Sequence, residues 1–301
     1  MKKVFLCEYI HPDAYELLKN HVDIIHFWEE FPEADAMINR NIKMTAELFA
    51  QTNKLKVIGI HGTGTDDVDL EEAFAKGIDV FSVPHVNARS VAEMNVALML
   101  SLGRKIILSD RMLKADLPEG YHSMLQGTEF HGKTLGLIGL GDISMKTAQI
   151  CRLGFGMKVI AWSRHFDKVE AEALGFHLHS VMDRIFEEAD IVMIGLNLDK
   201  STRKLIGKAQ FEKMKKDAFL INTSRGAIID EEALYCVLKE RRIGGAACDV
   251  FEEEPLKPLN PLLTLDNFVA TPHLGANTNE ALRNVGMAVV KGILKRLNIM
   301  E

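Results

Sequence analysis

The sequence predicts an α/β protein made of two Rossmann-like, doubly wound parallel-sheet domains with a cleft between them. Three observations support this fold class. Short β-rich runs alternate with helical patterns along the whole chain, which is typical of parallel α/β layers. The 301 residues amount to about twice an ordinary domain. A glycine-rich turn in the middle of the chain joins an apolar run to a helical pattern.

The first part of the chain contains four runs that predict strands and three shorter helical patterns between them. The predicted strands are residues 3–7, 23–27, 56–60 and 79–83, and the predicted helices are residues 12–21, 45–52 and 68–76. Gly77 is expected to end the third helix. A longer helix is predicted from Ser90 to about Ala115, with Ser90 and Glu93 in the spacing of a capping box.

A second alternating series follows the long helix. Its predicted strands are residues 134–138, 158–162, 191–196, 219–222, 245–250 and 268–271, and a last helix is predicted over 277–297. No linker rich in Pro, Gly or Ser separates the two series, so we place the domain boundary inside the long helix. We therefore expect a discontinuous substrate domain (1–98 with 275–301) and a dinucleotide-binding domain (99–274).

Composition excludes several classes of protein. The formal charge of −6 shows no basic excess, which argues against general nucleic-acid binding and against attraction to anionic membranes. The four cysteines are far apart and lack C-x-x-C pairing, so neither a disulfide scaffold nor a metal site is expected. No uncharged apolar stretch approaches the ~18 residues of a membrane span. The sequence thus predicts a soluble, cytosolic protein.

The glycine-rich turn is a candidate site for a dinucleotide. Gly139 and Gly141 match the first two glycines of G-x-G-x-x-G, which permit a tight turn and close approach of a pyrophosphate to backbone N–H groups. Ser144 takes the third position, where glycine normally allows close helix–strand packing. Asp142 is expected to cap the following helix, although its charge lies near the phosphate position.

The end of the next predicted strand indicates which dinucleotide is bound. NAD sites place Asp or Glu there to accept from the ribose 2′-hydroxyl, whereas this chain has Ser163 and Arg164. A hydroxyl beside a guanidinium suits a 2′-phosphate, so NADP(H) is favoured and NAD(H) remains an alternative. Arg164 could also be an ordinary solvated loop charge.

Three ionisable residues each follow a predicted strand in the second series: Arg225, Glu254 and His273. Ligands of open α/β sheets lie beyond the carboxyl ends of the strands, so these side chains are expected to face one crevice. Taken singly, each is most often an ion-paired or solvated residue. Together, after a dinucleotide loop, they form a candidate catalytic group of a cation, a carboxylate and a titratable imidazole.

The motifs TSRGAIID, DVFEEEP and TPHLGA, in this order, resemble those of the D-isomer-specific 2-hydroxyacid dehydrogenases, and the resemblance extends over nearly the whole chain. It implies an NAD(P)-dependent oxidoreductase that interconverts a small 2-keto acid and its D-2-hydroxy acid by hydride transfer. By the same resemblance His273 is the general acid and base, Arg225 binds and polarises the substrate, and Glu254 tunes the histidine.

The resemblance also implies further contacts. The backbone N–H groups of Thr63 and Gly64 would hold the substrate carboxylate, with Asp249 placed at the nicotinamide amide. Other implied cofactor contacts are Asp142, Ile143, Thr223, Ser224, Gly275 and Ala276. A homodimer is implied, with the segment from about Arg104 to Tyr121 packing against the second subunit. Asp67 and Asn197 depart from the family pattern, and His85 is expected to be structural.

The substrate is less closely defined. Arg40 matches a phosphate-binding position of phosphoglycerate enzymes, but Ile60 stands where a second arginine is usual in them. The chain is also expected to lack room for a serine-sensing domain. Glyoxylate, hydroxypyruvate or pyruvate is therefore favoured, with D-3-phosphoglycerate dehydrogenase activity as the alternative. A function of another class, a dinucleotide-sensing interaction protein like the C-terminal-binding corepressors, is a further alternative.

Overall fold

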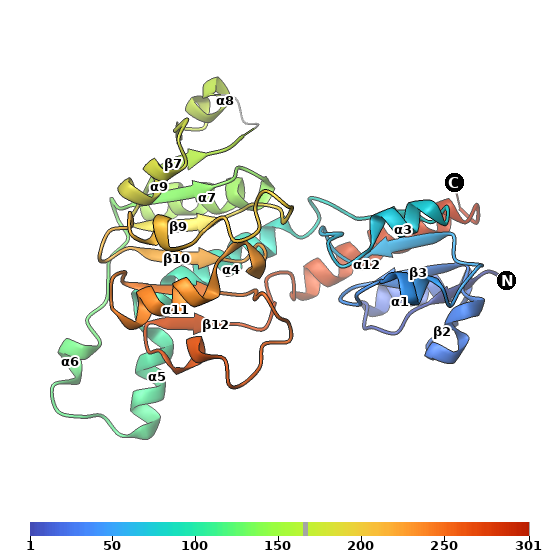
Figure 1. Cartoon of the computed structure of the whole chain (residues 1–301), viewed down its shortest axis with the longest axis horizontal. Helices are drawn as coiled ribbons and strands as arrows, with labels where there is room; N and C mark the ends of the chain where they lie inside the picture. The colour runs from blue at the N-terminus through green and yellow to red at the C-terminus, as the bar shows by residue number, and fades with distance from the viewer. Residues whose placement is uncertain (165–167, 301) are drawn as a thin grey trace. The chain divides into compact units, whose positions relative to one another are not determined.

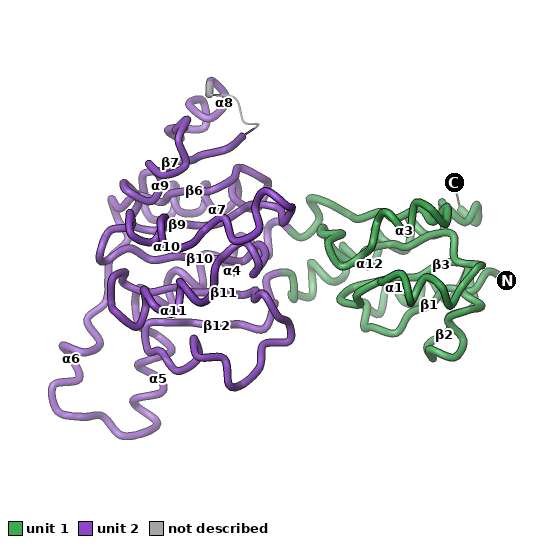
Figure 2. Tube along the Cα trace, in the orientation of Figure 1, with its two compact units in different colours: residues 1–87, 276–301 green, residues 88–275 purple. Residues whose placement is uncertain are grey.

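The computed structural model describes residues 1–164 and 168–300, and it divides them into two compact units (Figure 2). Unit 1 comprises residues 1–87 with 276 onward, and unit 2 comprises residues 88–275. Both are parallel α/β sheets with helices on their faces, as the sequence predicts. The first division lies at residue 87 rather than near 98, because the start of the long helix packs with the helices and strands of unit 2.

Unit 1 is built on a five-stranded parallel sheet in the order β2-β1-β3-β4-β5 (Figure 1). The strands are β1 (Lys3–Phe5), β2 (Asp23–Ile25), β3 (Ala36–Asn39), β4 (Val57–Ile60) and β5 (Asp79–Phe81). The helices are α1 (Pro12–Lys19), η1 (Trp28–Glu33), α2 (Ala46–Phe49), α3 (Leu70–Ala75) and α12 (Asn279–Arg296). Helix α12 packs on α1 and β4, so the last segment of the chain completes the first unit.

Unit 2 contains a seven-stranded parallel sheet in the order β12-β11-β10-β9-β6-β7-β8 (Figure 1). The strands are β6 (Thr134–Ile138), β7 (Lys158–Trp162), β8 (His177–Leu178), β9 (Ile191–Ile194), β10 (Phe219–Asn222), β11 (Gly245–Cys248) and β12 (Phe268–Ala270). The order reverses at β6, which places a topological switch point beside the glycine-rich turn. The helices that follow strands in this unit are α7 (Asp142–Phe155), α8 (Lys168–Ala173), α9 (Asp183–Glu188), α10 (Lys208–Phe211), η2 (Gly226–Ile228), α11 (Glu231–Lys239) and η3 (Pro261–Thr264).

The predicted long helix is two helices, α4 (Ala88–Gly103) and α5 (Ile106–Ala115), and the short α6 (Tyr121–Met124) follows. The break has a local cause, because Lys105 adopts a left-handed backbone with φ 53°. Gly103 packs against the ring of Phe130, so the end of α4 lies close to the sheet while α5 leaves it. Ser90 lies inside the first turn of α4 rather than at its cap, so the predicted capping box is wrong.

Two strands escaped prediction, and several predicted strands end early. Strand β3 is buried at every position, so it shows none of the alternation that reveals a half-exposed strand. Strand β8 has only two residues. The strands predicted to end at residues 7, 27 and 83 end two residues earlier, because the chain turns into loops at the carboxyl edge of the sheet.

No helix among the described residues is long and apolar enough to cross a membrane. Within residues 1–164 and 168–300, no group of three or more His, Cys, Asp or Glu side chains could hold a metal ion. The four cysteines are free thiols.

Candidate active site

The glycine-rich turn connects β6 to α7. Gly139 has φ 96°, a backbone conformation that L side chains rarely adopt, and Gly141 is the residue before the helix. A Cβ built on Gly141 meets nothing within 4 Å, so the backbone there is open to an approaching group. The first N–H groups of α7 have no partner within the helix, and such termini favour anions. Asp142 is the first helical residue and not the cap, so its predicted capping role is wrong.

The serine at the third fingerprint position is accommodated by a glycine from another strand. Ser144 is 1% exposed, and its hydroxyl has no hydrogen-bond partner. Gly195, directly after β9, faces this hydroxyl, and a Cβ on Gly195 would lie 2.1 Å from Ser144 Oγ. The space that glycine normally leaves on the helix is thus provided by the neighbouring strand.

The loop after β10 carries Arg225 and is organised by buried Asn222. The Asn222 Oδ1 atom accepts from the Ser224 backbone N–H (3.0 Å) and hydroxyl (2.7 Å), while its Nδ2 donates to the Arg225 carbonyl (3.0 Å). A Cβ on Gly226 would lie 1.9 Å from the carbonyl carbon of Phe251. The arginine loop is therefore packed directly on the segment that leads to Glu254.

His273 and Glu254 form a hydrogen-bonded pair. The His273 Nδ1 atom lies 2.7 Å from Glu254 Oε2, and Glu254 Oε1 accepts from the backbone N–H of Phe251 at 2.9 Å. An ionised carboxylate only accepts, so Nδ1 donates and Nε2 is left for other partners. The hydrogen bond and charge of Glu254 raise the pKa of His273 above its ordinary value, against the opposing effects of burial and of Arg225.

Glu254 remains ionised beside this histidine. Burial raises the pKa of its carboxyl, but the hydrogen bond and charge of His273 outweigh burial, with help from the Phe251 N–H and the Arg225 charge, so the pKa lies below its ordinary value. The Arg225 guanidinium thus acts on both members of the pair. Within unit 2 the three predicted catalytic side chains form one electrostatic cluster.

Buried Asp249 fixes the turn that presents His273. Its Oδ1 accepts from the Thr271 hydroxyl (2.5 Å) and the Leu274 N–H (2.8 Å), and its Oδ2 accepts from the Gly275 N–H (2.7 Å). The backbone N–H of His273 donates to the Asp249 carbonyl, and His273 itself has a left-handed φ of 54°. The sequence predicted Asp249 as a nicotinamide contact, but it did not reveal this organising role.

A second buried polar group, Asn95 on α4, was not predicted. Its Oδ1 accepts from the Thr223 hydroxyl (2.8 Å), and its Nδ2 donates to Thr147 Oγ1 (3.1 Å) on α7. The Thr147 hydroxyl in turn donates to the Ile143 carbonyl (2.9 Å). Asn95 therefore joins the helix of the glycine loop to the arginine loop. The sequence feature that could have revealed Asn95 is an amide side chain on an otherwise apolar face of the helix.

The adenosine end of the predicted dinucleotide site lies just past β7. Ser163 is partly buried, and Arg164 Nη1 donates to the Ser201 hydroxyl at 3.1 Å. Arg164 Nη2 also lies 3.6 Å from Asp199 Oδ2. Both partners belong to the loop after β9. This loop also contains Asn197, which departs from the family pattern. Arg164 is thus held by specific partners rather than being an isolated solvated charge.

Unit 1 carries the predicted substrate loop, which follows β4. The Thr63 hydroxyl donates to Asn87 Oδ1 at 3.3 Å, and Gly64 lies in the bend beside it. His61 precedes this loop, and burial, assisted by the charge of Arg40, lowers its pKa to about 4. The imidazole of His61 is therefore neutral at neutral pH. Ala276, a predicted cofactor contact, also falls in unit 1.

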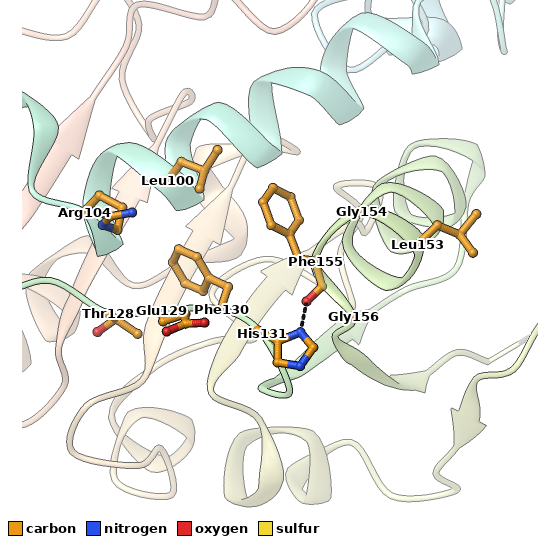
Figure 3. A pocket seen from close by; sticks show the side chains of 10 residues that line it. All are labelled: Leu100, Arg104, Thr128, Glu129, Phe130, His131, Leu153, Gly154, Phe155 and Gly156. Carbon is orange, nitrogen blue, oxygen red and sulfur yellow. Dashed lines mark hydrogen bonds between the residues drawn. The ribbon is translucent and has the colours of Figure 1, made fainter.

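A cavity of about 570 Å³ lies elsewhere in unit 2 (Figure 3). Its lining includes Leu100, Arg104, Phe130 and Phe155, near the end of α4 and the start of α5. None of its lining residues is a predicted site residue. The three side chains predicted to be catalytic instead follow β10, β11 and β12, at the carboxyl ends of these strands.

The chain is similar to known proteins in sequence and in structure. The sequence model of "D-isomer specific 2-hydroxyacid dehydrogenase, NAD binding domain" matches residues 96–275. The chain is 39% identical to D-3-phosphoglycerate dehydrogenase of Methanocaldococcus jannaschii, covering 99% of this chain and 58% of that protein. It is 38% identical to hydroxypyruvate reductase of Thermotoga maritima, covering 95% of this chain and 92% of that protein.

A solved structure is similar over nearly its whole length. D-lactate dehydrogenase from Aquifex aeolicus, complexed with NAD and lactic acid, superposes with a TM-score of 0.86 at 26% identity, covering 99% of this chain and 96% of that one. The chain spans only 50% to 58% of the length of the D-3-phosphoglycerate dehydrogenases it matches. These findings show that the chain belongs to the D-isomer-specific 2-hydroxyacid dehydrogenase family, whose nicotinamide-dinucleotide domain is unit 2.

Proposed function

We propose that this protein is an NAD(P)-dependent oxidoreductase that interconverts a small 2-keto acid and its D-2-hydroxy acid. The observation that carries the proposal is the pair of His273 Nδ1 and Glu254 Oε2 at 2.7 Å, with the Arg225 charge acting on both residues. An imidazole with a raised pKa and a directed tautomer is suited to donate a proton near neutral pH.

Each side chain then has one role. Arg225 binds the substrate carboxylate and polarises the carbonyl, since a guanidinium matches planar oxygens with two donors. Because Nδ1 of His273 is engaged by Glu254, Nε2 delivers the proton to the carbonyl oxygen during reduction and accepts it during oxidation. The nicotinamide, when bound, supplies or receives the hydride. Glu254 keeps the imidazole oriented and favours its protonated form.

We propose NADP(H) as the preferred cofactor. The Arg164 guanidinium and the Ser163 hydroxyl lie at the end of β7, where the adenosine ribose is bound in this fold. Gly139, Gly141, Asp142 and Ile143 would hold the pyrophosphate at the start of α7. Further along the cofactor, the proposed contacts are Thr223, Ser224, Asp249, Gly275 and Ala276.

We propose an unphosphorylated substrate of the glyoxylate, hydroxypyruvate or pyruvate type, with its carboxylate also held by the N–H groups of Thr63 and Gly64. Ile60 is a buried apolar residue at the end of β4, a position where phosphoglycerate enzymes resembling this chain place a cation. Phosphohydroxypyruvate is the second candidate. It is favoured by Arg40 and by the 39% identity to a D-3-phosphoglycerate dehydrogenase.

We further propose a homodimer formed through α5 and α6. Neither helix has a buried residue, and the two project from the rest of unit 2 (Figure 1). Ile106, Leu113 and Met124 expose between 51% and 67% of their surface. Such apolar exposure is typical of a surface that a partner covers. Sedimentation velocity should give a dimer that Leu113→Glu weakens, and a monomer at all concentrations would contradict the proposal.

The decisive experiment is a panel of 2-keto acids assayed with NADPH and with NADH. We expect turnover of at least one small keto acid, a lower KM for NADPH, and slower reduction of phosphohydroxypyruvate. Preference for phosphohydroxypyruvate would favour the second candidate. Binding of a nicotinamide dinucleotide without turnover of any keto acid would instead favour the dinucleotide-sensing interaction protein.

A further inference from the structure

A carboxylate lies against the arginine at the adenosine end of the site. Asp199 Oδ2 is 3.6 Å from Arg164 Nη2, and both side chains are about half exposed. The two residues come from different loops, after β7 and after β9. In Rossmann-type folds that use NAD the acidic group lies at the end of the second strand of the nucleotide-binding unit, the place of β7 here, so this carboxylate reaches the same region from another part of the chain.

The loop holds Asp199 firmly in this position. Its Oδ1 accepts from the Ser201 hydroxyl (2.6 Å), the Ser201 N–H (2.7 Å) and the Thr202 N–H (3.0 Å). The Thr202 hydroxyl donates to the Asn197 carbonyl and accepts from the Asp199 N–H. The hydroxyl of Ser201, followed by its N–H, lowers the pKa of Asp199, so the carboxyl is ionised at neutral pH.

We propose that Asp199 is a specificity-determining residue that weakens binding of the cofactor's 2′-phosphate and so limits the preference for NADPH over NADH. This inference rests on the proposed function, because it assumes that Arg164 receives that phosphate. A phosphate on Arg164 must displace the Asp199 carboxylate or lie within a few ångströms of it. Two anions then share one guanidinium, and their repulsion is absent when the ribose carries only a hydroxyl.

The variant Asp199→Asn isolates this charge. The asparagine Oδ1 can still accept the bonds from Ser201 and Thr202, so the loop retains its shape while the anion facing Arg164 is lost. Ser201 still accepts from Arg164, which keeps the guanidinium in place. An exposed ion pair contributes little to folding, so the variant is expected to fold normally.

The test is calorimetric titration of the full chain with adenosine 2′,5′-bisphosphate and with adenosine 5′-monophosphate, which differ only in the 2′-phosphate. Asp199→Asn should bind the bisphosphate about three- to fivefold more tightly, the upper part of the range for exposed charge pairs, and the monophosphate equally well. The gain should shrink at high ionic strength. An unchanged or weaker affinity for the bisphosphate, or an equal change for both ligands, would overturn the proposal.

A matched control is available at the opposite edge of the same sheet. Asp266 pairs with Arg241 at 2.5 Å, both are about half exposed, and Asp266 precedes β12. Asp266→Asn removes the same charge and should leave both affinities unchanged. The proposed oxidoreductase activity can fail separately from this inference. A protein that turns over no keto acid could still bind the bisphosphate more tightly after Asp199→Asn. An equal response in the control would assign the effect to net charge and contradict a local role.

Discussion

The two ends of the proposed dinucleotide site in unit 2 are built in different ways. At the catalytic end, buried Asp249 and Asn222 cross-link the loops that present His273 and Arg225. At the adenosine end, the partners of Arg164 among the described residues, Ser201 and Asp199, lie at the molecular surface. Buried hydrogen bonds fix geometry because breaking them leaves unsatisfied groups, whereas exposed ion pairs are weak and are screened by salt.

This difference predicts how each end responds to substitution. Changes at the catalytic end should alter the rate of the chemical step, because the proton donor must be placed within hydrogen-bond reach of the carbonyl oxygen. Changes at the adenosine end should alter which dinucleotide is preferred and leave the chemical step intact. The expected effects therefore fall from thousands-fold to a few-fold as the substitution moves from one end to the other.

The largest effect is expected for His273→Ala. The substitution removes the proton donor while leaving the Asp249 turn, so kcat should fall by about 10²- to 10⁴-fold, the range typical of general acid–base catalysis. Cofactor affinity, measured by quenching of protein fluorescence, should stay within twofold of the unmodified protein, to a rough approximation. His131→Ala, at a histidine whose Nδ1 contacts the Phe155 carbonyl far from the predicted site residues, is the control. A kcat close to that of the control would remove His273 from the mechanism.

A smaller loss is expected for Gly195→Ala, and it should be reversible. The new methyl group would lie 2.1 Å from Ser144 Oγ, which forces the end of β9 and the first turn of α7 apart. We expect cofactor affinity to fall by about tenfold or more, since overpacking of this kind costs 1–3 kcal/mol. Ser144→Gly should restore affinity in the double variant, because the remaining contact, 3.4 Å to the Gly139 carbonyl oxygen, is ordinary.

The control for this pair is Gly154→Ala. Gly154 lies in α7 like Ser144, but a Cβ added to it meets nothing within 4 Å. It should leave cofactor affinity unchanged. If Ser144→Gly fails to rescue Gly195→Ala, the two positions do not compensate each other, and the serine is tolerated for another reason. The cycle therefore tests a coupling between helix α7 and the residue after β9, which lie close together in space but far apart in the sequence.

The fold and the candidate site could be predicted from the sequence where a single segment is enough to identify an element or a motif. Every strand of unit 2 except β8, together with the glycine turn, could be predicted, because each shows as an apolar run or as a motif after one. The catalytic roles of Arg225, Glu254 and His273 stay predictions. Asn95, Gly195 and Asp199 could not be predicted as parts of the site. Their roles depend on partners 35 or more residues away, and those partners become neighbours only through the strand order.

The errors have equally local causes. The break between α4 and α5 depends on the left-handed backbone of Lys105 and on the packing of Gly103 against the Phe130 ring. Lysine is not a residue type that indicates a left-handed backbone in a sequence. Strand β3 is hidden because burial on both faces removes its alternation. The first unit ends at residue 87 rather than at the predicted residue 98, because apolar side chains of α4 pack against the sheet of unit 2.

Glu254→Gln should change the pH profile more than the maximal rate. The carboxylate raises the pKa of His273, so its loss should move that pKa downward. During reduction the histidine must be protonated, so the fall in rate at alkaline pH should begin at lower pH. During oxidation it must be neutral, so activity should appear at lower pH. Both shifts can be read from kcat/KM profiles.

Glu253→Gln provides the comparison for that profile, because Glu253 is exposed and pairs with Lys257 in the same loop. Its profile should match that of the unmodified protein. We expect the maximal rate of Glu254→Gln to fall by about tenfold, since the glutamine still orients the ring and removes only part of the acid–base advantage. Coincident profiles for the two variants would exclude Glu254 as the tuning group.

The smallest effect is expected for Arg164→Ala, at the exposed end. The 2′-phosphate loses a charge-assisted partner, so KM for NADPH should rise about fivefold, in keeping with the modest strength of solvent-exposed charge pairs. KM for NADH and kcat with either cofactor should not change, because the guanidinium lies beyond the reacting atoms. Arg241→Ala, which removes the arginine of the control ion pair before β11, should alter neither KM. A fall in kcat with Arg164→Ala would mean that the two ends are coupled, and the contrast between a fixed catalytic end and an adjustable adenosine end would then be wrong.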